Sequence, residues 1–374
     1  MVSFLLVKEQ LQMAGEPVQR RLQYVLEHFG KRPIENVVLN YFSLANEVYT
    51  ITTREGQFVV KNCFKNNSRE LVANEAGLIQ FLNDHQVPCP KLIPTLKGDL
   101  FLEYDGQFYI MNEFVEGWVP KWHDTLSEQL MHETMHAMAD FHRATEHFKP
   151  PFEPNRTAAL AIPDARLWLQ ALQPTLAQDS SPRQSVPQML SIVDELLQLA
   201  DSLQARLATR DLSVLKKVFI HGDLHCFNLI FSADQQDYRA ILDFDFIRED
   251  YRLVDFFWAT RSMVWGYWFE VLHGFSPRAN EHRITDEQLQ AATSRALAFM
   301  IDSYRTYHDL PDAEIRLLPL FAEALPFYTV RFFKLTNSEE ECLDHAGWFR
   351  HQLDNMAQTV RHLDVAIEQF LARD

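Results

Sequence analysis

Glycine and cysteine are both scarce in this sequence. Only 11 of the 374 residues are glycine, and none of them belongs to a G-x-G, G-x-x-x-x-G-K-[ST] or G-x-S-x-G motif. A P-loop NTPase, a fingerprinted Rossmann enzyme and an α/β-hydrolase each lose support, because their sites need glycine where the backbone turns tightly or approaches a ligand. The 4 cysteines are scattered and form no C-x-x-C pair, so neither a disulfide framework nor a cysteine zinc site is indicated.

Positive charge and long apolar runs are also lacking. The chain has 35 Lys and Arg against 51 Asp and Glu, which gives a net charge of −16 at pH 7. Such a charge repels nucleic-acid backbones and anionic lipid surfaces, so we expect neither nucleic acid nor a membrane as a partner. The early apolar run at residues 4–7 is too short for a signal peptide or a membrane span. These features predict a cytoplasmic protein.

The remaining composition is that of an ordinary globular protein, with 47% hydrophobic and 23% charged residues. At about 100 to 200 residues per domain, the length allows two domains or one domain of two lobes. In the first third, β-branched and aromatic runs separated by turn residues predict two hairpins, and a stretch with helical apolar spacing predicts a helix between them. The hairpin strands are expected at 48–53 with 57–64 and at 100–104 with 107–112, and the helix at 71–82.

After Gly117 the pattern becomes mainly helical, with one island of strands. We therefore predict an α+β protein with a small β-rich N-terminal lobe at residues 1–112 and a larger, mainly helical C-terminal lobe at residues 113–374. Helices are expected around 126–142, 165–172, 188–207, 254–269, 289–307 and 345–370, and the strands of the island at 217–220, 229–231 and 238–246.

Polar chemistry is concentrated on that island. Residues 221–228 read H-G-D-L-H-C-F-N, and Asp243-Phe244 follows 20 residues after Asp223. This is the layout of a kinase catalytic loop and its metal-binding aspartate. Asp223 would orient an acceptor hydroxyl and take its proton, while Asn228 and Asp243 would supply oxygen ligands of the kind that Mg²⁺ prefers.

Two charged residues stand in apolar surroundings upstream. Lys61 ends the apolar run F-V-V-K, and Glu75 lies on the helical face of Leu71, Leu78 and Leu82. Taken alone, Lys61 would more simply be an edge lysine whose tip reaches water. A buried charge needs a partner, however, and the simplest partner for each of the two is the other. A strand lysine paired with a helix glutamate, and reaching ATP phosphates, is the kinase arrangement.

With these pieces in order, residues 37–259 resemble the aminoglycoside phosphotransferase and choline kinase superfamily, the small-molecule branch of the protein-kinase-like fold. Within it, the sequence is most similar to homoserine kinase type II-like and stress-response-kinase-like proteins. The resemblance implies a bilobal fold and an ATP- and Mg²⁺-dependent phosphotransferase. Residues 221–228 resemble the family's catalytic loop, residues 241–244 its metal-binding strand, and Asp255 its downstream Asp-Leu-Ala element.

The resemblance also implies how the nucleotide is held. The sequence N-E-F-V-E-G at residues 112–117 is similar to the hinge that holds adenine, which assigns Glu113 and Val115 to nucleotide binding through their backbone groups. Ser43 and Asn46 lie in the loop that would face the phosphates. That loop contains no glycine, which departs from the usual phosphate-binding pattern.

An aromatic stripe follows the catalytic motifs. A stripe of this kind is usually core, but Arg261 in its middle needs a carboxylate or phosphate partner. The partner would be internal, such as Asp245 or Asp255, or an acidic group on the acceptor. In the second case Arg261, Asp245 and Asp255 would belong to the substrate site. The stripe consists of Val254, Phe257, Trp258, Arg261, Trp265 and Trp268.

The predicted reaction is transfer of the ATP γ-phosphoryl group to a hydroxyl of a small molecule. The acidic surface suits an acceptor that carries an amine, such as an aminoglycoside, an amino alcohol or homoserine. One alternative is a protein Ser/Thr kinase of the stress-response type, although no A-P-E signature follows Asp243. The other is a catalytically silent nucleotide-binding scaffold, against which the intact set Lys61, Asp223, Asn228 and Asp243 argues. The acceptor and the oligomeric state stay open.

Overall fold

The computed structural model describes ten stretches of the chain, and they group into two compact units. The first, here called the mixed unit, comprises Lys8–Asn155 and Phe219–Arg248, and the second, the helical unit, comprises Arg156–Val218 and Glu249–Asp374. The predicted lobe boundary after residue 112 stays a prediction. The described residues are 12–13, 16–31, 34–42, 46–63, 68–121, 127–153, 158–179, 183–266, 285–329 and 338–373.

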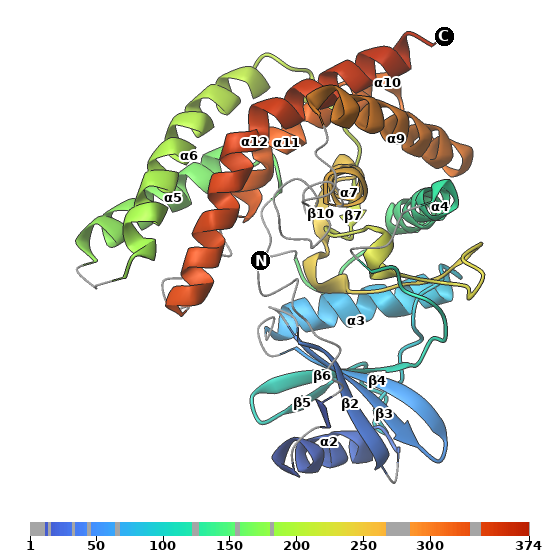
Figure 1. The fold of residues 1–374 in the computed structure, drawn as a ribbon. Coiled ribbons are helices and arrows are strands. Elements are labelled where there is room, and N and C mark those ends of the chain that lie inside the picture. Colours follow the sequence, from blue (N-terminus) through green and yellow to red (C-terminus); the bar gives the residue numbers. More distant parts are fainter. Residues whose placement is uncertain are drawn as a thin grey trace. The chain divides into compact units, whose positions relative to one another are not determined.

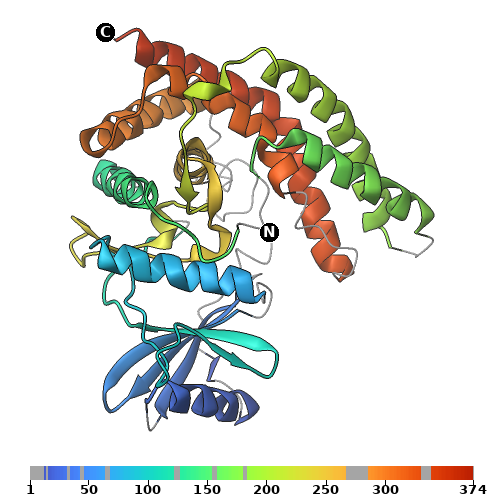
Figure 2. The same cartoon turned by 180° about the vertical axis from the view of Figure 1, so that it is seen from behind.

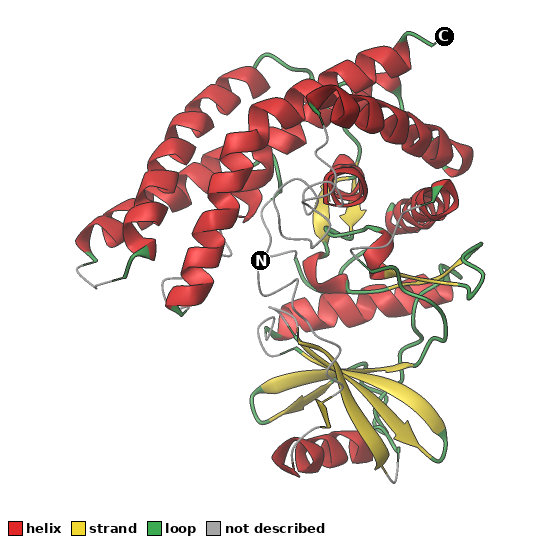
Figure 3. Cartoon of the chain, viewed as in Figure 1, coloured by secondary structure: helices red, strands yellow, loops and turns green. Residues whose placement is uncertain are grey.

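An antiparallel sheet forms the base of the mixed unit, with strand order β1-β2-β3-β4-β6-β5 (Figures 1 and 3). Both predicted hairpins are present: Thr53 pairs with Gly56 at the first turn, and Tyr104 pairs with Gln107 at the second. Lys61 pairs with Val48 on one side and with Ile110 on the other, so it lies in the middle of the sheet. The strands are β1 Gln12–Met13, β2 Ile34–Phe42, β3 Glu47–Thr53, β4 Gly56–Asn62, β5 Leu102–Tyr104 and β6 Gln107–Glu113.

The two faces of this sheet are covered by different helices, α2 (Glu16–His28) and α3 (Arg69–Asp84) (Figures 1 and 2). Because side chains alternate along a strand, Phe58 and Val60 join the α2 side. Cys63 and Ile110 pack with Ala76 on the α3 side. Lys61 shares the second face by the same alternation. The core on the α2 side comprises Leu22, Val25, Leu26, Phe29, Val37, Tyr49, Ile51, Phe58, Val60, Tyr109 and Met111.

Helix α3 confirms the helix predicted at 71–82 and extends it at both ends. Ser68 caps its N-terminus, because the Ser68 hydroxyl accepts a hydrogen bond from the Leu71 N–H (3.2 Å). Glu75 lies among the buried residues of the helix together with Leu78 and Leu82. The sequence pattern therefore located the helical face that carries Glu75. Helix α2 was not predicted.

The strand island is also present in the structure. Strands β7 (Lys217–Ile220), β8 (Leu229–Phe231) and β9 (Tyr238–Ile241) match the predicted strands, and β8 pairs with β9 in antiparallel register. The predicted extension of the last strand to residue 246 is wrong. β9 ends at Ile241 because Asp243 adopts a left-handed conformation (φ 63°), and residues 244–246 form a short 3-10 helix. A further strand, β10 (Arg248–Tyr251), follows.

Helices build most of the remainder (Figure 3). In the mixed unit, α4 (Glu128–Thr145) matches the helix predicted around 126–142. In the helical unit, α10 and α11 were not predicted, and the part of the 254–269 helix beyond residue 266 lies outside the described residues. The helices of this unit are α5 Ile162–Gln178, α6 Ser185–Leu207, α7 Leu253–Thr260 with the π-helix Arg261–Gly266, α9 Asp286–Tyr307, α10 Asp312–Ile315, α11 Leu318–Thr329 and α12 Glu339–Leu371.

Two further observations bear on the sequence-based expectations. All four cysteines are free thiols, and all are buried. Among the helices of the described stretches, none combines the length and apolar character that crossing a membrane requires.

Candidate active site

The loop that follows β7 is held in place by His221. The fully buried His221 ring donates from Nε2 to the Leu242 carbonyl oxygen (2.8 Å). Its Nδ1 accepts from the Asp223 N–H (3.3 Å). Phe141 of α4 and Phe244 pack against the ring, with centroids 5.9 and 5.2 Å away. His221 therefore connects the Asp223 loop to the Asp243 segment as a scaffold.

Gly222 lies between His221 and Asp223 in a position that suits only glycine. Its φ is +83°, a conformation that side chains disfavour. A Cβ atom here would lie 2.5 Å from the Phe246 carbonyl oxygen and 2.7 Å from Nη1 of Arg248. The tight approach of these two segments brings Asp223 toward the Asp243 segment, and any larger residue would separate them.

Asp223 and Asn228 are linked directly. Nδ2 of Asn228 donates to the Asp223 carbonyl oxygen (2.8 Å) and to its Oδ2 (3.2 Å). Nε2 of the buried His225 lies 3.3 Å from the other carboxylate oxygen, Oδ1. The Asp223 side chain remains 26% exposed, as a base that meets an external hydroxyl must. Because the amide nitrogen of Asn228 is used in this way, its oxygen is the group left to ligate a cation.

Asp243 lies in a crowded group of carboxylates. Leu242, immediately before it, is held at its N–H by the Asn228 carbonyl oxygen (2.9 Å) and at its carbonyl by His221. Burial raises the pKa of the Asp243 carboxyl well above its ordinary value, and the nearby charges of Asp245 and Asp223 raise it further, against the opposing effect of Lys61. The left-handed backbone at Asp243 is costly for a residue with a side chain, and such conformations are concentrated at functional sites.

Lys61 supplies the positive charge of the site. Its ammonium nitrogen lies 2.6 Å from Oε1 of Glu75, which is the contact predicted from the two buried charges. It also forms an ion pair with Asp245. Burial alone would lower the pKa of Lys61, but the charges of Asp245 and Glu75 outweigh it and hold the pKa well above its ordinary value. Lys61 is therefore a fixed cation that touches two carboxylates.

Asp245 has a place that the sequence did not indicate. The sequence suggests that Asp245 contacts the substrate or pairs with Arg261. In the structure, Asp245 is only 4% exposed and forms an ion pair with Lys61. The amide nitrogen of Asn46 donates to its other carboxylate oxygen. The predicted phosphate-facing residue Asn46 and Lys61 thus share one carboxylate partner. The D-x-D spacing after β9 was the available signal. Ser43 lies outside the described residues.

The predicted hinge follows the end of β6. The Glu113 N–H donates to the Lys91 carbonyl oxygen (2.9 Å), and the Phe114 N–H donates to the Gln57 carbonyl oxygen (3.4 Å). The Glu113 side chain is exposed and Val115 is half-buried. An adenine-binding role for Glu113 and Val115 stays a prediction.

The remaining predicted residues belong to the helical unit. Asp255 is fully buried in the first turn of α7, where its charge is favourably placed for the helix dipole. The Arg261 guanidinium lies over the rings of Trp258 and Trp348, 5.2 and 5.8 Å from their centroids. Trp348 of α12 was not singled out in the sequence. Substrate contact by Asp255 and Arg261 stays a prediction.

The oxygen donors fit a divalent cation that is shared with phosphates. No group of three or more His, Cys, Asp or Glu side chains suited to a metal occurs in the described part of the chain. The Asn228 amide and the Asp243 carboxyl form a smaller set, whose other ligands would be water and phosphate oxygens, as is usual for Mg²⁺. The carboxylates of Asp223 and Asp245, which lie near Asp243, are a second reason to expect a cation there.

The fold and the residues around Asp223 define a kinase-like phosphotransferase. Residues 43–283 match the model of the phosphotransferase enzyme family (APH), and the chain belongs to this family. It is accordingly an enzyme that transfers a phosphoryl group to a hydroxyl acceptor. A search among curated proteins found no match.

Three solved structures resemble the chain along nearly its whole length. The amicoumacin kinase hAmiN, in complex with AMP-PNP, Ca²⁺ and Ami, has 17% sequence identity and a TM-score of 0.64 over 91% of this chain and 94% of that chain. Spectinomycin phosphotransferase APH(9)-Ia has 13% identity and a TM-score of 0.63 over 96% and 100%. The microcompartment-associated aminopropanol kinase has 16% identity and a TM-score of 0.61 over 93% and 99%. These likenesses confirm the predicted α+β, kinase-like fold.

Proposed function

We propose that this enzyme transfers the γ-phosphoryl group of ATP to a hydroxyl of a small molecule that carries an amine. The observation that carries the proposal is the convergence of Lys61, Glu75, Asp223, Asn228 and Asp243 within one compact unit. Each residue type has one task in phosphoryl transfer, and the set supplies a cation for the phosphates, oxygen ligands for a metal and a base for the acceptor.

Asp223 would accept the acceptor's hydroxyl proton, because its carboxylate is partly exposed and held by Asn228 and His225. Lys61, fixed by Glu75, would exchange Asp245 for phosphate oxygens of the nucleotide. Asn228 and Asp243 would hold Mg²⁺, which when bound neutralises phosphate charge during transfer. Most of the rate enhancement would then come from positioning and electrostatics.

The acceptor class rests on charge and on fold relatives. A chain with a net charge of −16 favours a cationic small molecule over a phosphorylated or acidic one. Structures of the same fold include enzymes named for spectinomycin, amicoumacin and aminopropanol. We therefore propose an amino alcohol, an aminoglycoside-like compound or homoserine as the first acceptors to test.

The test measures ADP release from Mg·ATP across a panel of these acceptors, with choline, sugars and generic protein substrates included. We expect one class of amine-bearing hydroxyl compound to stimulate release in the wild type. In Asp223→Asn we expect a loss of about a thousandfold or more, because the base is removed while the loop geometry is kept. If only protein substrates stimulate ADP release, the enzyme is a protein kinase and the small-molecule proposal is wrong. ATP binding without any acceptor-dependent turnover would favour a silent scaffold.

A further inference from the structure

Helix α3 makes contacts to the segment after α4 through a second face, which lies next to the face that carries Glu75. Asn74 is only 3% exposed, and its side chain bonds to the backbone of Phe152 in both directions. Nδ2 of Asn74 donates to the Phe152 carbonyl oxygen (3.0 Å), and the Phe152 N–H donates to Oδ1 (2.9 Å). Both backbone groups of Phe152 are thereby satisfied by one side chain, as a neighbouring strand would do.

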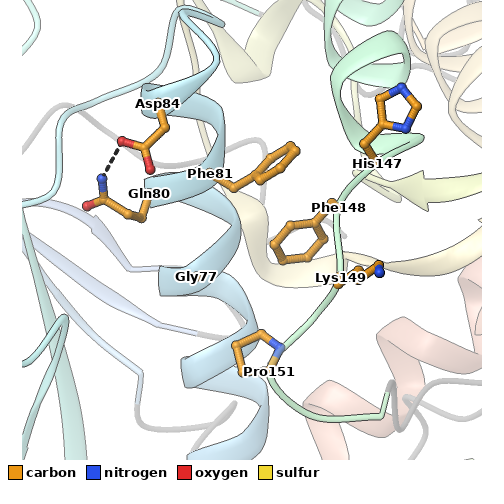
Figure 4. A pocket seen from close by; sticks show the side chains of 8 residues that line it. All are labelled: Gly77, Gln80, Phe81, Asp84, His147, Phe148, Lys149 and Pro151. Carbon is orange, nitrogen blue, oxygen red and sulfur yellow. Dashed lines mark hydrogen bonds between the residues drawn. The ribbon is translucent and has the colours of Figure 1, made fainter.

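Packing along the same helical face reinforces these bonds. Residues 74, 77 and 81 lie at i, i+3 and i+7 and therefore share one face of α3. Figure 4 shows Pro151 beside Gly77 and Phe148 facing Phe81, along a groove of about 340 Å³ between α3 and the segment after α4. A Cβ atom on Gly77 would lie 3.1 Å from Cγ of Pro151, and the two phenyl centroids are 5.2 Å apart. We call Asn74, Gly77 and Phe81, with Phe148, Pro151 and Phe152, the α3 tether.

The other end of the tether connects to the catalytic loop. The Phe148 ring also packs against Phe219 of β7 (centroids 4.9 Å apart), two residues before His221. Phe148 follows α4, whose Phe141 packs against His221 and Phe244. The tether therefore links the helix of Glu75 to the supports of Asp223 and Asp243 by a route that does not pass through Lys61.

We propose that Asn74 is a positioning residue, which sets the rotation and height of α3 so that Glu75 holds Lys61 where the nucleotide phosphates need it. The proposal rests on the proposed function. The physical reason is that buried hydrogen bonds are directional, whereas the burial of apolar surface is not. Since Asn74 immediately precedes Glu75, any displacement of this turn of α3 is passed to the carboxylate that fixes Lys61.

The first test compares Asn74→Ala with Asn83→Ala. Asn83 is a matched control because it is on the same helix and also bonds to backbone, accepting from the Leu92 N–H (3.4 Å), but it makes no bond to the segment after α4. For acceptor-dependent ADP release, we expect Asn74→Ala to lower kcat/KM for Mg·ATP by about tenfold or more, the size of effect that a small misplacement produces. Asn83→Ala should stay within about twofold of the wild type. Equal effects of the two substitutions would overturn the proposal.

A double-mutant cycle separates positioning from loss of stability. In a Glu75→Gln background, Asn74→Ala should lower kcat/KM by less than about threefold further, because the contact through which it acts is already weakened. A merely structural role would give the same factor in both backgrounds, and that result would contradict the proposal. Thermal unfolding of all four proteins shows whether each is folded at the assay temperature.

Gly77→Ala tests the same tether without removing a hydrogen bond. This variant can be measured even if Asn74→Ala does not fold. Alanine favours the helix, but its methyl group would press on Pro151. We expect a melting temperature at or above that of the wild type and a kcat/KM lower by about threefold. Pro151→Ala in the same chain should restore kcat/KM by removing the crowding. A Gly77→Ala enzyme with wild-type kinetics would contradict the proposal.

A last measurement needs no catalysis. Hydrogen exchange without nucleotide should show faster exchange of the α3 amides in Asn74→Ala than in Asn83→Ala, because only the first substitution releases the helix from the segment after α4. Unchanged exchange of α3 would overturn the tether. A wild-type protein that neither binds Mg·ATP nor releases ADP would instead refute the proposed function, while the exchange comparison would still test the tether.

Discussion

Both compact units contain a buried basic residue that is paired with carboxylate, and these two arrangements differ in kind. In the helical unit, Arg252 binds Glu314 through two bonds, Nε to Oε1 (3.0 Å) and Nη2 to Oε2 (2.6 Å), and both residues are at most 2% exposed. In the mixed unit, Lys61 divides one ammonium group between Glu75 and Asp245. We call the arginine pair closed, because one guanidinium binds both oxygens of one carboxylate. We call the lysine pair shared, because one ammonium group contacts two different carboxylates.

The difference follows from the chemistry of the two cations. A guanidinium matches a carboxylate edge to edge and gains little from exchanging that partner, which suits a permanent core contact. An ammonium group is a compact charge with three donors and can pass from a carboxylate to a phosphate without rebuilding its surroundings. A buried ion pair is thus a sign of function when its geometry leaves the cation shared, and a sign of architecture when the pair is closed.

Breaking the closed pair should have the largest effect. Arg252→Ala leaves the Glu314 carboxylate buried without a cation, so we expect the free energy of unfolding to fall by about 3–5 kcal/mol in urea titrations at pH 7. The activity per folded molecule should be unchanged. Arg252→Met combined with Glu314→Gln keeps an acceptor for the Lys216 N–H and should recover most of the loss. Equal destabilisation by the single and double substitutions would show that the pair itself stabilises the unit.

Breaking the shared pair should affect catalysis instead. Lys61→Met removes the cation that we propose binds the phosphates, and we expect kcat/KM for Mg·ATP to fall by about a hundredfold to a thousandfold. Lys61→Arg keeps the charge but brings a wider, planar group into a site built for an ammonium, so it should also lose about tenfold or more. Circular dichroism establishes that each variant is folded. Near-wild-type activity of Lys61→Met would contradict a role for Lys61 in binding the nucleotide, and near-wild-type activity of Lys61→Arg would show that a positive charge alone is sufficient.

An exposed contact of the helical unit should show the smallest effect, visible only in acid. Hydrogen bonds from Ser185, together with Arg183, lower the pKa of Glu339 to about 2. A lowered pKa contributes stability that is present above the unfolded value near 4.5 and is lost as pH falls toward about 2. In Glu339→Gln this part of the acid dependence should be absent. The measurement is the melting temperature of the wild type and of Glu339→Gln at a series of pH values between about 4.5 and 2. If the two proteins lose stability equally as the pH falls, the prediction is wrong.

Motif spacing and periodicity were enough to predict much of the site. The H-x-D-x-x-x-x-N spacing placed Asp223 beside Asn228, and the helical face of Glu75 predicted its contact with Lys61. Local signals located the hairpins, because turn residues and alternation act within a few residues of one another. The strand predicted through residue 246 failed because Asp243 is left-handed, and the residue before it, Leu242, is held by His221 and Asn228, which are distant in sequence.

Other features had no local signal at all. Asn74 reads as an ordinary polar residue of a helix, and only the placement of Phe152, 78 positions away, gives it two partners. Asp245 shares Lys61 and Asn46 across separations of 184 and 199 residues. Arg252 and Glu314 are likewise unremarkable in sequence until the chain brings them together.

The sequence by itself determined the residue types of the catalytic loop, the helical and strand periodicities and the buried charges that required partners. These depend on chemistry and on short-range geometry, which neighbouring residues carry. Only the tertiary structure decided which partner each charge has, which asparagine is tied to a distant backbone and where the last strand of the island stops. Those choices depend on surfaces that meet across long loops, and their energies exist only once the chain has folded.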